Sequence, residues 1–290
     1  MKKDITSLFC FIDDFCKAIE QDIKSHQISE GSMPKNPTRT SGTTVSEIMT
    51  IMLMFHESPF KNFKYFYKFC MPSYRSEFPE MPTYERFVVL MSRTLYLFVI
   101  LLTCMLRRDS KLAYIDSTPI SVCHIKRERS HRVFKGLAIK GRSTKGWFFG
   151  FKLHIVIDTK GNLMNVKMTK GNVEDRSPVL QMTRDMTGFL FGDKGYISKE
   201  LFLKLLARGL KLITGIKKNM KNMLMTINEK ILLRKRSLVE TVFDYLKNKF
   251  MLEHTRHRSI FNFLIHIIST LIAYQIKPTK PHISMHYAVN

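Results

Sequence analysis

The sequence predicts an α/β protein in which a mixed β-sheet flanked by helices follows an all-helical N-terminal region. Two observations carry this prediction. Apolar residues over the first 105 positions recur at helical spacing, and strand-like runs after position 110 give way to alternating helices and strands. With 290 residues, 44% of them apolar, the chain can bury a substantial core.

The first 105 residues predict helices. Threonine and serine precede Glu47 in TTVSEIMTIMLMFHES, which is typical of a capped helix start. Phenylalanines recur every third residue in PFKNFKYFYKFC, which predicts a second helix with an aromatic core stripe. A third helix begins after Pro82 and runs through Leu106, and the Ser-, Gly- and Pro-rich segment 29–42 predicts a loop.

The remaining residues predict the sheet and its helices. KLAYIDSTPISVCHI predicts a β-rich stretch that is broken at Pro119, and DTKGN predicts a tight turn between two strands. Strands are further predicted in GWFFGFKLHIVID, LMNVKM, GFLFGD and KLITGI, and helices in DRSPVLQMTRDM, SKELFLKLLARGL, 236–250 and 259–276. This order favours a mixed sheet flanked by helices.

The net charge of +23 is concentrated in the later part of the chain. Residues 1–105 hold 12 Lys and Arg against 11 Asp and Glu, whereas residues 106–290 hold 35 against 13. A field of this kind attracts polyanions, and nucleic acid is the commonest of them. A basic ribosome-associated protein or a membrane-surface protein is the alternative.

Cysteine usage and the apolar segments predict a cytoplasmic protein without a membrane span. The five cysteines are scattered and form no Cys-x-x-Cys pair, so neither a zinc ribbon nor a disulfide framework is predicted. Early aspartates argue against a secretory signal. Arg93 interrupts the apolar stretch 87–106, and Asn262 and His266 interrupt 259–276, so both stretches predict buried helices.

Three acids of the basic part have unusually apolar neighbours. Asp116 and Asp193 each end an apolar strand, and Glu240 lies among the apolar residues of a predicted helix. Burying a carboxylate without a partner is costly, although each position by itself also fits a turn former or a surface charge. Other acids have ordinary explanations, such as a helix cap for Asp175 and a surface position for Glu253.

Three carboxylates in a protein that holds a polyanion make chemical sense around a divalent metal. Like charges repel one another and repel phosphate, whereas Mg²⁺ prefers oxygen ligands and keeps several waters. Two such ions, about 3.5–4 Å apart, can activate a nucleophile and stabilise the leaving oxygen of a phosphoryl displacement. Arg236, Glu240 and Lys247 fall on or near one face of the predicted helix.

These motifs resemble bacterial insertion-sequence transposases of the DDE type, within the retroviral-integrase (ribonuclease H-like) superfamily. YIDSTPI resembles the strand of the first acid, and GDKGYIS resembles the segment of the second. RSLVETVFDYLK resembles the Arg-x3-Glu-x6-Lys signature, with Arg236, Glu240 and Lys247 in register. GFKLHIVIDTKGN and KGNVEDRSP resemble the strand, turn and helix start between the first two acids, so the likeness covers about residues 106–276.

The chain departs from the family pattern in two places. Leu233 stands where many relatives carry a tyrosine. The 46 residues between Asp193 and Glu240 leave no room for the large inserted β domain of some relatives, which indicates the compact group.

The resemblance implies a ribonuclease H-like DDE catalytic domain over residues 106–276. A helical N-terminal domain (1–105) would serve DNA-end binding or dimerisation, and residues 277–290 would form a tail. Asp116, Asp193 and Glu240 are implied as the catalytic and metal-binding residues, with Mg²⁺ as the cofactor, in two copies, and Mn²⁺ as a substitute.

The expected partner is double-stranded DNA, both as terminal inverted repeats and as target. The basic segment HIKRERSHRVFKGLAIKGRSTKG (124–146) predicts a DNA-tracking loop, with a solvated basic loop as the alternative. The single tryptophan, Trp147, could stack on a base or serve the core or hairpin. The residues expected to contact DNA are Lys126, Arg127, Arg129, Arg132, Lys135, Lys140, Arg142, Lys145, Lys194, Arg236 and Lys247.

The resemblance implies DNA cleavage at insertion-sequence ends and strand transfer into target DNA. The protein would be nucleoid-associated in a bacterial cytoplasm and would act as a homodimer or larger assembly. Three alternatives stay open: a metal-dependent DNA nuclease of the same fold, a transposase-derived DNA-binding repressor without catalysis, and a basic structural nucleic-acid-binding protein.

Overall fold

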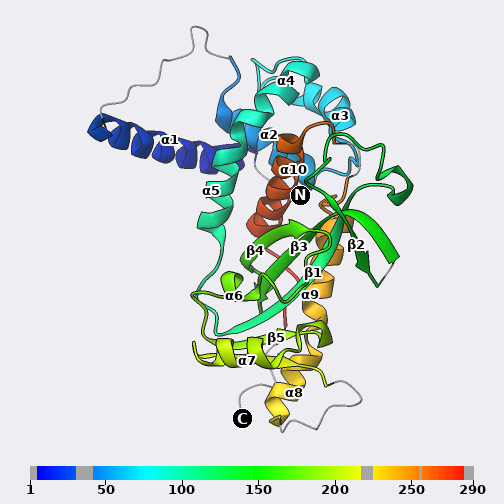
Figure 1. Cartoon of the computed structure of the whole chain (residues 1–290). Coiled ribbons are helices and arrows are strands. Elements are labelled where there is room, and N and C mark those ends of the chain that lie inside the picture. Colours follow the sequence, from blue (N-terminus) through cyan, green and yellow to red (C-terminus); the bar gives the residue numbers. More distant parts are fainter. Residues whose placement is uncertain (1–4, 31–41, 145, 217–224, 255–256, 284–290) are drawn as a thin grey trace. The chain divides into compact units, whose positions relative to one another are not determined.

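The structure is a computed structural model in which residues 5–30, 42–144, 146–216, 225–254 and 257–283 are described (Figure 1). The chain divides into two compact units. The N-terminal unit comprises residues 1–104 and 259–274, and the sheet unit comprises residues 105–258 and 275–290. The chain therefore leaves the N-terminal unit, forms the sheet unit, and contributes one late helix to the N-terminal unit.

The described part of the N-terminal unit is helical, as predicted. Its α-helices are α1 (Ile5–Glu30), α2 (Val45–Glu57), α3 (Phe63–Tyr65), α4 (Tyr84–Met91), α5 (Leu95–Met105) and α10 (Ile260–Ile276). The start of α2 carries a capping box, because the Thr44 side chain accepts from the Glu47 amide and the Glu47 carboxylate accepts from the Thr44 amide. Most of the predicted loop 29–42 lies outside the described residues.

The helix α10 was expected within the catalytic domain 106–276, but it packs in the N-terminal unit. It is buried from Ile265 to Tyr274 except at position 268. His56 of α2 hydrogen-bonds the Ser269 hydroxyl across 2.7 Å, and its ring lies 5.0 Å from that of His266. The polar groups of this apolar helix thus find partners on α2, which explains why the helix joins the helical unit.

One apolar stretch, Tyr84–Met105, is long and apolar enough to cross a membrane by length and composition. Its mean hydropathy is 2.1, and 39% of its most apolar window is buried. Phe98 and Leu101 face the interior of the protein, whereas Tyr96 and Val99 are exposed. The stretch expected to be a buried helix is therefore only partly buried.

A π-helical turn, Phe66–Cys70, changes which aromatic residues after α3 are buried. Phe66 and Tyr67 are buried, whereas Phe69 is 69% exposed. The predicted every-third-residue core stripe is wrong at Phe69, because the wider turn shifts the following side chains around the helix axis.

The described residues of the sheet unit form a six-stranded mixed sheet. Its strands are β1 (Leu112–Cys123), β2 (Ile139–Ser143), β3 (Gly146–Asp158), β4 (Leu163–Lys170), β5 (Gly188–Gly192) and β6 (Leu210–Thr214). The order is β2-β3-β1-β5-β6, with β4 also paired to β3. β3 runs antiparallel to β1, β2 and β4, whereas β5 runs parallel to β1 and β6.

The strand β1 is continuous through Pro119, so the predicted break there is wrong. Pro119 stays in register opposite Lys152 of β3, and the irregularity comes later, between Ser121 and Cys123. β5 pairs only with the first residues of β1, so in the described part of the chain no strand lies beside Pro119 on that side of β1. A proline is tolerated in a strand where its missing N–H would face such an edge.

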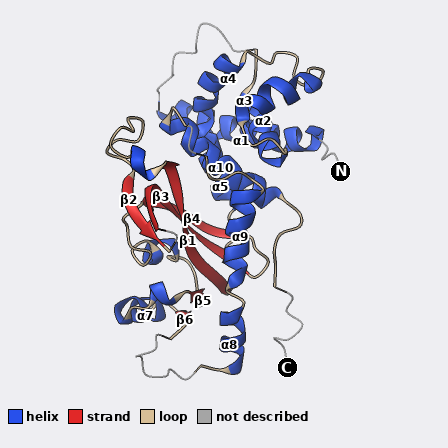
Figure 2. Ribbon diagram, turned by 90° about the vertical axis from the view of Figure 1, so that its right-hand side faces the viewer, coloured by secondary structure: helices blue, strands red, loops and turns tan. Residues whose placement is uncertain are grey.

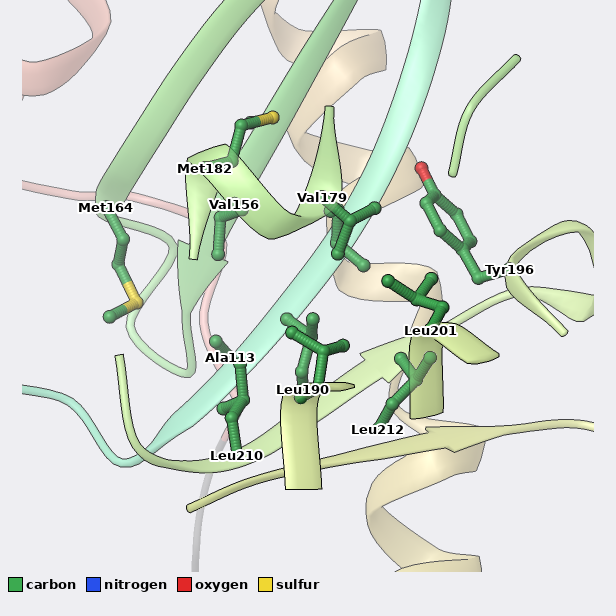
Figure 3. Close-up of a cluster of buried hydrophobic side chains, with 12 residues drawn as sticks. Ala113, Val156, Met164, Val179, Met182, Leu190, Tyr196, Leu201, Leu210 and Leu212 are labelled. Carbon is green, nitrogen blue, oxygen red and sulfur yellow. The ribbon is translucent and has the colours of Figure 1, made fainter. Parts of the chain in front are cut away.

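Helices cover both faces of β1. They are α6 (Val179–Met182), α7 (Lys199–Leu206), α8 (Ile227–Arg234) and α9 (Ser237–Asn248). Ala113 and Ile115 join a buried cluster with residues of α6 and α7 (Figure 3). α9 lies along the sheet and contacts β1 (Figure 2). A mixed sheet flanked by helices confirms the predicted fold class and is consistent with a ribonuclease H-like fold.

Tyr114 lies on the opposite face of β1. Its ring stacks on Phe191 of β5 at 5.3 Å, and its hydroxyl donates to the Leu232 carbonyl of α8 across 3.2 Å. Successive side chains of a strand alternate between faces, so Asp116 shares the face of Tyr114. The fold thereby directs the first candidate acid to the side of the sheet on which α8 and α9 lie.

Replacing Gly150 by alanine is expected to destabilise the sheet unit. A Cβ at Gly150 would overlap the Ile120 carbonyl oxygen of the neighbouring strand, so the backbone must shift. We expect urea denaturation to show a loss of about 1–3 kcal/mol, the usual cost of overpacking. Thr144→Ala, at an exposed position of the same hairpin, is the control. An unchanged unfolding midpoint for Gly150→Ala would contradict the strand register.

Candidate active site

Asp116 and Asp193 lie at the same level on neighbouring parallel strands. Tyr114 of β1 is in register with Phe191 of β5, and each aspartate follows its strand partner by two residues. Neighbouring strands are about 4.8 Å apart. The register therefore brings the first two acids together at the end of β5, although 77 positions separate them in the sequence.

Asp193 forms the turn after β5 and is also a candidate ligand. Its Oδ1 accepts a hydrogen bond from the Gly195 amide across 2.8 Å, at the start of the short 3₁₀ turn Lys194–Tyr196. A Cβ on Gly195 would lie 2.9 Å from that oxygen, so a larger residue at this position would displace the Asp193 carboxylate. The turn fixes the direction of the carboxylate through one of its two oxygens.

Glu240 lies in the first turn of α9. Its carboxylate forms an ion pair with the Arg236 guanidinium across 2.9 Å, with 55% of the Glu240 side chain and 28% of the Arg236 side chain exposed. Val239 and Val242, on either side of Glu240 in the sequence, are completely buried within the sheet unit. The helix is thus fixed by its apolar face, and the acid emerges at the edge of that face.

The charges of the three acids act on one another at Asp116. Burial is the largest cause that raises the pKa of Asp116, to about 7, and the negative charges of Asp193 and Glu240 raise it further. The hydrogen bond from the Ser117 amide, 2.8 Å from Oδ1, and the charge of Arg236 oppose this shift. Near neutral pH, Asp116 is therefore poised between its protonated and charged forms.

The three acids match a hard divalent cation in donor type. Carboxylate oxygens are the ligands that Mg²⁺ prefers, and a buried carboxyl with raised pKa gains from a nearby positive charge. In the part of the chain that the structure describes, however, no three Asp, Glu, His or Cys side chains form a group that could hold a metal ion. The pairing of Glu240 with Arg236 is consistent with this, because it directs the third carboxylate to a guanidinium.

A family comparison bears on the same region. Residues 107–260, which are 154 of the 290, match the model of a transposase DDE domain. The chain belongs to the DDE transposase family. No curated protein and no solved structure matches the transposase. Members of this family act on DNA and generally use divalent metals.

The matched region of the transposase contains all three candidate acids. It begins shortly before β1 and ends at Ile260, the first residue of α10. The match therefore includes the strands and helices of the sheet unit that carry Asp116, Asp193 and Glu240. The specific roles of these three residues stay predictions.

Sequence reasoning placed Asp175 in a helix cap, and the structure gives it other partners. Its Oδ1 accepts from the Ser117 hydroxyl across 2.7 Å and lies 3.0 Å from the Lys152 ammonium. Ser117 directly follows Asp116, so Asp175 is tied to the strand of the first acid. The motif KGNVEDRSP drew attention to Asp175. Its hydrogen bond with Ser117, 58 positions away, cannot be inferred from that motif alone.

Tyr196 is a further residue that sequence reasoning missed. Its ring belongs to the apolar cluster, and its hydroxyl points away from the aliphatic side chains (Figure 3). The hydroxyl is buried and has no hydrogen-bond partner among the described residues. Burial raises the pKa of Tyr196, and the charges of Asp116, Asp175 and Asp193 raise it further. The hydroxyl therefore remains protonated beside the acids.

His154 is a core residue of β3. It is completely buried, and its Nε2 lies 2.8 Å from the Thr169 hydroxyl. Burial lowers the pKa of His154 to about 4, so the ring is neutral at physiological pH. His124 is exposed, and its ring accepts from the Lys126 amide.

The basic segment 124–146 is held by apolar residues and displays its cations. Phe134 is completely buried, with its ring 5.9 Å from that of Phe151, and Ala138 is also buried. The exposed cations of the segment are Lys126, Arg127, Arg129, Arg132, Lys135, Lys140 and Arg142. Lys145 lies outside the described residues. The segment is thus anchored by buried apolar residues while its cations face solvent. This arrangement suits a fixed phosphate-binding surface better than a mobile loop.

The other predicted DNA contacts differ in their surroundings. Lys194 is exposed directly after Asp193. Lys247, in contrast, donates to the Pro119 carbonyl across 2.9 Å and pairs with Glu253 across 3.2 Å. The contacts of Lys247 join α9 to β1, so this residue has a structural task whether or not it also contacts DNA.

Replacing Asp116 by asparagine is expected to change how stability depends on pH. A folded-state pKa of about 7 exceeds the ordinary value of 3.8, so the folded protein binds more protons between these two values than the unfolded chain. Wild-type stability therefore falls as pH rises from about 4 to about 7, by at most about 4 kcal/mol. We expect Asp116→Asn to lose this fall in thermal unfolding with EDTA present.

The exposed Asp185 provides the matched control, as Asp185→Asn. This variant should keep the wild-type pH dependence of the melting temperature. Parallel pH profiles for wild type and Asp116→Asn would contradict the burial of a carboxyl with raised pKa at this position.

Proposed function

We propose that this transposase cuts DNA at the ends of an insertion sequence and joins those ends to target DNA by metal-dependent phosphoryl transfer. In this proposal Asp116, Asp193 and Glu240 are the catalytic, metal-binding carboxylates. The single observation that carries the proposal is the raised pKa of the partly buried Asp116, to which both other acids contribute. The repulsion among the three carboxylates would be relieved by a bound cation, which gives a chemical reason for placing them together.

The donor set fits Mg²⁺ ions, with Mn²⁺ as a substitute. Bound divalent ions supply Lewis-acid polarisation of the phosphoryl oxygens and activation of the attacking oxygen. Asp116, on β1, and Asp193, after β5, provide oxygen ligands from two adjacent strands. Asp116 must give up its carboxyl proton to bind a cation, so metal affinity rises with pH around 7.

The Arg236–Glu240 pair provides the third ligand and a phosphate contact. In the structure the two side chains satisfy each other on the surface of α9. When DNA binds, a phosphate replaces Glu240 as the partner of Arg236, and a guanidinium suits this contact because it binds phosphate in a bidentate manner. Glu240 is then released toward Asp116 and Asp193. The ligand group is completed only when metal and DNA are both present.

The Tyr196 hydroxyl and Asp175 support the site from the other side of β1. Asp175 holds the Ser117 hydroxyl, next to Asp116. Tyr196 keeps its proton and offers a donor beside the acids, because burial and three carboxylates oppose its ionisation.

The proposed partners are the terminal inverted repeats of the element and a target duplex. The exposed cations of the basic segment hold phosphates by charge, an attraction that weakens as salt rises. The helices of the N-terminal unit bind the element ends or a second copy of the chain. Joining two ends in one reaction requires a homodimer or a larger assembly.

Replacing Glu240 by glutamine is expected to abolish cleavage and joining. The transposase is incubated with a duplex that carries the ends of its element, a supercoiled target, and Mg²⁺, Mn²⁺ or EDTA. Wild type should give cleaved and joined products only with metal. Glu240→Gln should lower the rate by at least about 100-fold, because even indirect metal contacts are typically worth 10- to 100-fold.

Glu200 of α7 is a matched control for this variant, because it also pairs with a cation one helical turn away, Lys204. Glu200→Gln should retain activity. Cleavage without joined product would favour a nuclease, and end-specific binding without cleavage would favour a repressor. Full activity of Glu240→Gln would contradict the assignment of Glu240 as the third catalytic acid.

Mg²⁺ is expected to raise the melting temperature of the wild-type protein. A ligand that binds only the folded state stabilises it by about 2.7 kcal/mol at 100 times its dissociation constant. The rise should be larger at pH 8 than at pH 6, because below about pH 7 protons compete for Asp116. Asp116→Asn should lose most of the rise in differential scanning calorimetry, and an equal rise in wild type and variant would place the metal elsewhere.

A further inference from the structure

Trp147 is exposed at the start of β3, beside two cations of β2. It is the single tryptophan of the chain, and 58% of it is accessible to solvent. The Lys140 ammonium lies 4.9 Å from the centre of the indole, and the Arg142 guanidinium carbon lies 5.8 Å from it. An aromatic ring with two flanking cations combines a stacking surface with two phosphate-binding groups.

The strand pairing fixes this arrangement. Arg142 lies directly opposite Trp147 in the antiparallel β2–β3 pair, and Lys140 lies opposite Phe149, the next residue on the same face. The turn between the strands is closed by a hydrogen bond from the Ser143 hydroxyl to the Gly146 carbonyl. The three side chains therefore project together from a short, paired hairpin, which limits the entropy lost when a ligand binds.

This group lies on the same face of the sheet as the first acid. Asp116 is paired with Ile155, and residues 147, 149, 151, 153 and 155 of β3 all point to one face. Ile155, the strand partner of Asp116, lies eight residues along β3 from Trp147, which corresponds to roughly 27 Å. Phe149 and Phe151, between them, are buried. The tryptophan group is thus a second site, distinct from the acids but facing the same side.

We propose that Lys140, Arg142 and Trp147 form a subsite for an unpaired nucleotide of the bound DNA. This inference rests on the proposed function, which supplies DNA as the partner. The indole stacks on the base, while the two cations hold the phosphates on either side of it. The subsite adds affinity for DNA that has an unpaired stretch about 27 Å from the acids, along the strand direction.

The ligand is an unpaired nucleotide rather than an intact duplex for a geometric reason. In a duplex the faces of the bases are covered by their neighbours, so a ring on the surface of a sheet reaches only base edges and phosphates. An unpaired base offers its face to the indole without the cost of unstacking. The cations alone would bind any polyanion, so the stacking ring is what makes the subsite recognise a base.

The tryptophan fluorescence of the protein reports on the environment of Trp147 alone, because the chain has no other tryptophan. The full chain is titrated with oligothymidylate, with a fully paired duplex, and with heparin, a polyanion without bases, in EDTA so that cleavage cannot occur. We expect oligothymidylate to quench the emission of Trp147 strongly, the duplex to quench it less, and heparin to leave it nearly unchanged. Binding of each polymer is measured independently by competition with a labelled oligonucleotide.

Three variants separate stacking from charge. Trp147→Ala should weaken oligothymidylate binding about 5- to 150-fold, the range for loss of one base–aromatic stack, and Trp147→Phe should restore part of it. The Lys140→Ala/Arg142→Ala variant should reduce the slope of log affinity against log salt by about 0.7 for each phosphate that is no longer neutralised. Lys160→Ala removes an exposed cation from the other end of β3 and is the control for charge.

Equal quenching by heparin and oligothymidylate, or bound oligothymidylate without quenching, would overturn the subsite. So would unchanged affinity of Trp147→Ala. Failure of the proposed function gives a different pattern. Quenching by oligothymidylate would persist, because binding needs no catalysis, while the cleavage and joining assay would show no metal-dependent product.

Discussion

The accumulation of negative charge around the partly buried Asp116 is the constraint on which the arrangement of the sheet unit depends. Partial loss of hydration is the largest cause that raises the pKa of this carboxyl, and the charges of Asp193 and Glu240 raise it further. The protein offsets part of this cost with the Ser117 amide and the charge of Arg236. A structure selected for stability alone would avoid such an arrangement, because replacing the acid by a neutral residue removes the cost.

Keeping the charges together requires that α9 sit firmly on β1. Lys247 reaches the Pro119 carbonyl, and Glu253 accepts from the Ser121 amide while it pairs with Lys247. These contacts use backbone groups of β1 that pair with no described strand on that side. The proline is therefore part of the docking surface, because it leaves the β1 edge open to a helix instead of a strand.

Local physics made several elements predictable. Thr44 and Glu47 are three residues apart, so their reciprocal caps depend on nothing distant. The turn after Asp158 and the alternation of β3 and β4 are equally local. Predictions failed where a distant partner decides. Asp175 binds Ser117 instead of capping a helix, and α10 follows its buried contacts with α2 rather than its place in the chain.

By itself, the sequence determined the fold class, the uneven charge and the identity of three acids with apolar neighbours. Short-range patterns encode these features, because strand alternation, helix spacing and charge counts do not depend on distant contacts. The tertiary structure alone decided that Asp193 stands level with Asp116, that Glu240 pairs with Arg236, and that the buried Tyr196 hydroxyl feels the charges of the acids. Each of these follows from strand register or helix docking, which depend on the packing of segments far apart in the chain.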